Sequence, residues 1–140
     1  MSSTKRTSLT SLELRKQTME ALGWQLTQVD SDAPLGYSYH VAEPIGNSWA
    51  VCRTLDEALG CMPPIESSIA VAMEELEKLC KSRQGYWTLT YATYYGLDET
   101  RNHYRCHLCI SGMRQSIHRD GATPAEAIAL CILKALTEKR

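Results

Sequence analysis

The sequence has no apolar run long enough to cross a membrane. Its longest one is AIALCIL at residues 127–133, which is far shorter than the roughly 20 residues of a spanning helix. The segment MSSTKRTSLTS contains basic residues but no apolar stretch behind them, which is not the pattern of a secretory signal. We therefore expect a cytoplasmic protein with no membrane partner. Residues 1–8 are expected to be a disordered lead-in, and residues 9–140 a single domain.

An excess of charge of either sign is also absent. The chain has 15 Lys and Arg against 16 Asp and Glu, for a net charge of −1. A general affinity for nucleic acid is therefore not expected, because such binding needs a positive surface. Hydrophobic residues make up 44% and charged residues 22% of the chain, and this composition is typical of a folded globular domain.

Recognisable catalytic motifs are missing as well. The sequence has no glycine-rich phosphate loop, no H-E-x-x-H and no G-x-S-x-G. Nothing in the spacing of the four histidines places them beside an Asp or a Cys. We therefore predict a protein that is not an enzyme and needs no cofactor.

The six cysteines include one C-x-x-C and no second close pair. Without an export signal they suggest a reducing compartment, and a structural zinc site usually needs two such pairs. The pair lies in HYRCHLC, residues 103–109, where successive side chains of a strand would point to opposite faces. Cys106 and Cys109 would then lie on different sides, with Cys106 in the core and Cys109 partly exposed. We predict a strand with no metal, and a redox pair is disfavoured because no helix begins behind it.

Sequence periodicity predicts three helices, two long strands and a third, shorter strand that is optional. Residues 24–64 are interrupted repeatedly by glycine and proline and are rich in aromatic residues, which favours a long loop pinned onto the domain, with room for short edge strands. The expected fold is an α/β (α+β) sandwich in which helices pack on an antiparallel sheet of two or three strands. Its order is helix 9–22, long loop, helix 67–83, strand 86–95, strand 103–111, the optional strand within 112–121, and helix 124–137.

Three segments resemble the phage ABA sandwich domain family, small proteins of bacteriophages and prophages. They are ALGW at 21–24, PPIESSIAVAMEELEKL at 63–79 and TPAEAIALCILKAL at 123–136. The family often has Tyr-Ser-Thr-Asp before the middle helix, where this chain has Ile65-Glu66-Ser67-Ser68. The resemblance implies an α/β sandwich, a phage or prophage origin and a location in the cytoplasm of a bacterial host. It implies no established activity.

Positive charge is concentrated between Thr100 and Arg119, a segment without Asp or Glu. Because a guanidinium can bind phosphate with two hydrogen bonds, we predict an anionic nucleotide site in this segment. The predicted contacts are Arg105, His107 and Arg114, with Arg101 and Arg119 as secondary contacts and Tyr91 or Tyr94 stacking on a base. The alternative is structural: a solvated outer strand face, or an edge strand whose charges block aggregation.

The closing helix is apolar nearly all round between Ile128 and Leu133. Such a helix must be covered on both sides, either by the long loop or by another subunit. The second choice predicts a homo-oligomer formed through residues 124–137.

Two kinds of function follow from these patterns. One is a sponge, a phage protein that sequesters a nucleotide second messenger of host antiviral defence. The other is a protein-binding inhibitor or adaptor that uses Trp24, Tyr37, Tyr39 and Trp49 as anchors. Double-stranded RNA binding is a weaker third choice, since the start of the closing helix, residues 123–126, carries no positive charge.

Overall fold

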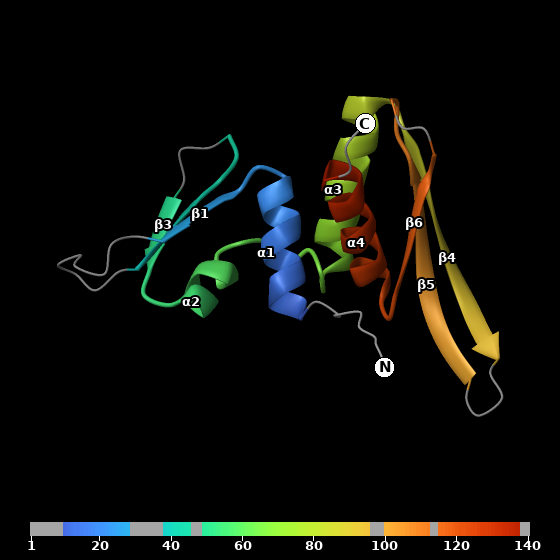
Figure 1. The fold of residues 1–140 in the computed structure, drawn as a ribbon, viewed down its shortest axis with the longest axis horizontal. Coiled ribbons are helices and arrows are strands. Elements are labelled where there is room, and N and C mark those ends of the chain that lie inside the picture. Colours follow the sequence, from blue (N-terminus) through green and yellow to red (C-terminus); the bar gives the residue numbers. More distant parts are fainter. Residues whose placement is uncertain (1–9, 29–37, 46–48, 96–99, 113–114, 138–140) are drawn as a thin grey trace, which may run out of the picture.

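The computed structural model describes residues 10–28, 38–45, 49–95, 100–112 and 115–137, and within these segments the chain forms four helices and six strands. The helices form the middle of the molecule, between a small sheet on one side and a larger sheet on the other (Figure 1). This arrangement confirms the predicted mixed sandwich of helices and antiparallel strands. The predicted lead-in at residues 1–8 lies outside the described residues.

The larger sheet has the strand order β4-β5-β6, and both strand pairs are antiparallel. The two long strands pair over their full lengths, with Tyr86 opposite Cys109 and Tyr95 opposite Thr100. The optional third strand is present and pairs with the middle one. The bounds are β4 Tyr86–Tyr95, β5 Thr100–Cys109 and β6 Ile117–Gly121. The sequence therefore predicted this sheet correctly.

The three predicted helices are also confirmed, as α1 Ser11–Ala21, α3 Ile69–Arg83 and α4 Pro124–Thr137. Their ends show why the sequence signals work. Gly23 has a φ of 110° beyond α1, and its N–H bonds to the Glu20 carbonyl while that of Trp24 bonds to Met19, which together close a Schellman motif. Thr123 caps α4 by accepting from the N–H of Glu126 at 3.1 Å.

The interpretation of residues 24–64 as mainly a long loop is wrong, although the short strands for which it left room are present. This region contains a second antiparallel sheet in the order β1-β2-β3 and a short helix. Its strands are four residues each, which is too short for a clear alternation of apolar and polar positions. The bounds are β1 Gln25–Gln28, β2 Tyr39–Ala42, β3 Trp49–Cys52 and α2 Leu55–Gly60.

The closing helix α4 lies at the centre of the core. It packs on β5 and β6 on one side and on α1 and α3 on the other (Figure 1). Ile128, Cys131 and Ile132 are completely buried within the single chain. The helix is therefore covered on both sides, as expected, but its cover comes from this chain's own helices and sheet. The apolar run thus gives no reason for a subunit interface at residues 124–137.

None of the helices in the described residues is long and apolar enough to span a bilayer.

Candidate functional site

The larger sheet has two chemically different faces. Trp87, Leu89, Cys106, Leu108 and Ile117 share the face that packs on the helices. The opposite face is polar, because side chains alternate along a strand. We call this the polar face; it consists of Thr88, Thr90, His103, Arg105, His107, His118 and Asp120.

The motif HYRCHLC lies in the regular strand β5, as predicted. Cys106 is completely buried against the helices, whereas Cys109 is half-buried and lies on the other face of the sheet. Within the described residues, no group of three or more His, Cys, Asp or Glu side chains could hold a metal ion. The alternation of side chains along β5 places Cys106 and Cys109 on opposite faces and so holds them apart.

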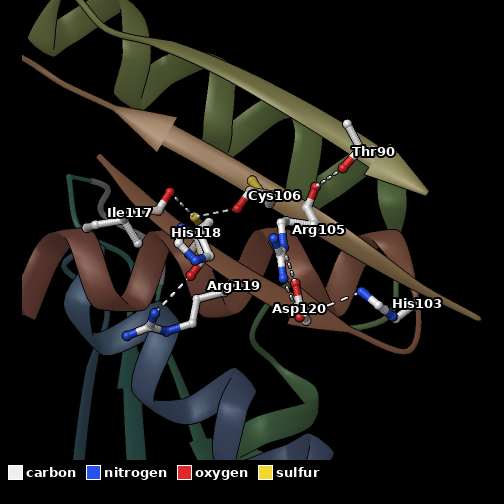
Figure 2. Close-up of polar contacts among 9 residues, drawn as sticks. Thr90, His103, Arg105, Cys106, Ile117, His118, Arg119 and Asp120 are labelled. Carbon is white, nitrogen blue, oxygen red and sulfur yellow. Dashed lines mark hydrogen bonds and ion pairs between the residues drawn. The ribbon is translucent and has the colours of Figure 1, made fainter. Parts of the chain in front are cut away.

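Arg105 is bound to a carboxylate across the sheet. Its Nε and Nη2 donate to the two carboxylate oxygens of Asp120 at 2.7 and 3.1 Å, and Nε2 of His103 lies 3.7 Å from the same carboxylate (Figure 2). The hydrogen bonds from Arg105 hold the pKa of Asp120 below its ordinary value, with help from the charges of His103 and His118. An incoming phosphate would therefore have to compete with Asp120 for this guanidinium.

Sequence reasoning missed Asp120 because it lies one residue beyond the basic segment. The antiparallel register places it directly opposite Arg105, fifteen residues earlier in the chain. The sequence does concentrate positive charge between Thr100 and Arg119, but the carboxylate that offsets the charge of Arg105 comes from the neighbouring strand β6.

His107 contacts other side chains of the polar face and its neighbours. His107 lies opposite His118 in the register, and one of its ring nitrogens is 2.7 Å from the Ser116 hydroxyl. The ring of Tyr86 meets that of His107 edge-on, with centroids 6.5 Å apart.

Two predicted site residues lie on the other side of the sheet. Arg119 pairs in register with the buried Cys106 and donates to the His118 carbonyl at 2.8 Å. Tyr91 pairs with Tyr104, with ring centroids 4.9 Å apart. Neither side chain shares a face with Arg105, because each is in register with a residue of the helix-packed side. Their predicted grouping with Arg105 in one site is therefore wrong.

The remaining predicted residues are placed only in part. Arg101 and Tyr94 are opposite one another in the β4–β5 register, but their side chains lie outside the description. Arg114 lies outside the described residues altogether. The strand that carries Arg105 is the central one of the sheet, so the alternative of a charged edge strand does not apply to β5, although it does apply to β6, the edge strand that carries His118 and Arg119.

A second candidate surface is an open groove of about 640 Å³ beside α3. We call it the α3 groove; its apolar wall consists of Leu22, Trp24, Pro44, Ile45 and Leu79. It brings together the end of α1, the segment after β2 and the outer side of α3, which are far apart in the sequence. Close packing of Gly23 on Pro44 fixes one side, since a Cβ at Gly23 would lie only 3.0 Å from the Pro44 Cβ.

Of the four aromatic residues predicted as protein-binding anchors, Trp24 lies in this groove. Tyr39 is half-buried in β2 and packs against the core. Tyr37 and the side chain of Trp49 are outside the described part of the chain.

No model of a known protein family matches this chain, and a search of curated proteins found no match either. The membership of the phage ABA sandwich family is therefore a prediction from the three sequence segments. The two surfaces described above are the observations from which a function can be argued.

Proposed function

We propose that this chain acts by binding another protein, and that the α3 groove receives an apolar segment of that partner. The observation that carries the proposal is an apolar wall held open to solvent. Ile45 on this wall is 94% exposed, while Leu79 at its base is 7% exposed. Exposed apolar side chains that line a concave surface are the usual form of a peptide or protein contact site.

The charges around the groove indicate the chemistry of the partner. Glu43, Glu75 and Lys78 lie along it, and the ammonium of Lys78 is 3.6 Å from Glu74 and 3.4 Å from Glu75. The carboxylates therefore outnumber the lysine, and the groove has a negative rim. A partner segment with apolar residues and a neighbouring Lys or Arg would complement it.

The resemblance to phage proteins extends this proposal. A small phage protein that holds a segment of another protein acts as an inhibitor or adaptor, so the partner would be a host defence protein or a phage factor. This step depends on the resemblance, whereas the groove and its rim do not.

A peptide display library tests the groove directly. We expect the purified protein to enrich short apolar sequences with an adjoining basic residue, and Ile45→Asp to lower the affinity of an enriched peptide at least tenfold. The matched control is Ile69→Asp, because Ile69 is 44% exposed at the start of α3 and does not line the groove. No enrichment, or an equal loss for both variants, would contradict the proposal.

The second candidate is the nucleotide sponge, and one observation favours it. Arg105, His103, His107 and His118 share the exposed polar face of one sheet. Asp120 offsets the charge of Arg105, so a bound phosphate would have to displace this carboxylate from the guanidinium. The ligand would be an anionic nucleotide signal of host antiviral defence.

Calorimetry against cyclic di- and trinucleotides and cyclic ADP-ribose isomers tests the sponge. We expect affinity to decrease with added salt and to be lost in Arg105→Ala. The control is Arg119→Ala, which removes an arginine from the opposite face. If no nucleotide of the panel binds, the sponge is excluded for these ligands and the protein-binding proposal stands alone.

A further inference from the structure

Strand β4 is a long edge strand without the usual protection. It lies at one end of the order β4-β5-β6, so one side of its backbone has no strand partner among the described residues. Its ten residues, YWTLTYATYY, include no Lys, Arg, Asp, Glu, Pro or Gly. Soluble proteins usually protect such an edge with charges, prolines, bulges or a short strand.

The opposite edge of the same sheet shows this protection. Strand β6 has five residues and carries His118, Arg119 and Asp120. The two edges are therefore treated differently, and the longer one is left neutral and open. Tyr86 and Tyr91 on it are 59% and 56% exposed, which is unusual for large aromatic side chains.

We propose that β4 pairs antiparallel with β4 of a second copy of this chain, which would join the two larger sheets into one of six strands. A two-fold axis perpendicular to the sheet keeps both polar faces on the same side. Since directly opposite residues in a sheet share a face, the axis must pass midway between the two copies of one residue. The overlap is longest when that residue is Thr90 or Tyr91. With Thr90 on the axis, residues 86–94 of the two copies pair over about 30 Å.

The second copy is favoured over a foreign strand by self-complementarity. A two-fold axis places each residue of the strand opposite another residue of the same strand, and the residue on the axis opposite its own copy; like charges opposite one another would destabilise the sheet. A neutral strand avoids this penalty along its whole length. An open hollow of about 560 Å³ lies between α3 and the start of β4, lined in part by Glu77, Lys81 and Trp87. The far end of the partner strand would run alongside it.

This interface replaces the one predicted at residues 124–137. Helix α4 is buried within its own chain, whereas the outer edge of β4 has no strand partner among the described residues. The interface of the proposed homo-oligomer is therefore the edge of β4 and not helix α4. The inference is independent of the α3 groove, which neither β4 nor β5 lines.

Charge-swapped variants of Thr90 test the pairing. Thr90 is exposed, and within the described part of the chain its side chain makes a single long hydrogen bond, 3.5 Å, to the Arg105 carbonyl, so a charged residue there should leave the fold intact. Light scattering should show a dimer for the wild type. Thr90→Lys and Thr90→Glu should each raise the dissociation constant at least tenfold, because two like charges then face each other across the axis. An equimolar mixture of the two variants should restore a dimer with one copy of each, as native mass spectrometry would show.

The matched control is His118→Lys, which adds the same charge to the exposed face of the opposite edge strand and should leave the dimer unchanged. Hydrogen exchange supplies a measurement that needs no variant: alternate amides of β4 should be protected at high protein concentration and lose protection on dilution. A wild type that is monomeric at millimolar concentration, a dimer that survives Thr90→Lys, or variants that fail to form a mixed dimer would each overturn the proposal.

Discussion

Replacing Arg15 should show how strongly one partly buried ion pair holds α1 against the rest of the helices. The Nε and Nη2 of Arg15 donate to the two carboxylate oxygens of Glu66 at 2.9 and 2.8 Å, and Nη1 donates to the Leu59 carbonyl at 3.0 Å. The two side chains are 14% and 5% exposed. Arg15 thus fastens α1 to α2 through Leu59 and to the segment before α3 through Glu66. It thereby helps to fix the end of α1, after which Trp24 lies in the α3 groove.

The expected cost follows from what each change leaves behind. Arg15→Met keeps most of the volume but leaves the Glu66 carboxylate buried without its partner, which should cost about 3–5 kcal/mol of unfolding free energy. Replacing both residues, as Arg15→Met with Glu66→Leu, removes the buried charge as well. The double variant should then lose only about 1 kcal/mol, mainly for the lost Arg15 bond to the Leu59 carbonyl, which still accepts from the N–H of Met62 at 3.2 Å. The single variant should therefore be clearly less stable than the double one.

The pH dependence gives an independent reading. Burial raises the pKa of Glu66, but the hydrogen bonds from Arg15 and from the local backbone outweigh it, so that the pKa lies below its ordinary value. The unfolded pKa of a glutamate is about 4.3. A group whose pKa is lowered by folding contributes its full stability above this unfolded pKa, and this contribution is lost as the pH falls through the folded pKa. The wild type should thus lose stability below about pH 4 more steeply than the double variant.

Urea unfolding followed by circular dichroism measures all three proteins between pH 3 and 7. The slope of free energy against urea should be the same for each, so that the midpoints report stability alone. This interpretation of the ion pair would be refuted if Arg15→Met lost less than about 1 kcal/mol and if its stability fell below pH 4 as steeply as that of the wild type. The pair would then behave as a solvent-exposed one.

Three further predictions concern single features. Gly121→Ala should destabilise the protein by about 1–3 kcal/mol, because a Cβ there would lie 2.5 Å from the backbone nitrogen of Ala127. The control Gly60→Ala should be neutral or stabilising, because a Cβ there would have no atom within 4 Å. Thermal unfolding measures both. Oxidised glutathione should join Cys52 to Cys61, whose sulfurs are 3.6 Å apart, and faster at high pH because burial raises the pKa of Cys52 to about 11; mass spectrometry that finds another pair oxidised first would contradict this. A chelator should leave the melting temperature unchanged, and stoichiometric zinc in elemental analysis would overturn the interpretation of HYRCHLC as a plain strand.

The local features of this fold could be predicted from the sequence, because their signals lie within a few residues. Thr123 and Glu126 mark the start of α4, and Gly23 marks the end of α1. The alternation around Cys106 predicts a strand and correctly separates it from Cys109. These patterns depend on backbone geometry alone, and so each can be read without knowing what the segment packs against.

The candidate sites depended on contacts between distant segments, which the sequence does not specify one by one. Arg105 looked like a phosphate contact until the β5–β6 register placed Asp120 opposite it. Arg119 is in the same basic run but on the other face of the sheet, since its face is set by the strand with which it pairs. The α3 groove likewise exists only because Trp24 and Ile45 come together beside α3. Sequence alone determined the three long helices and the larger sheet, through propensity, capping and periodicity, whereas only the tertiary structure decided the short strands of the smaller sheet and which side chains meet.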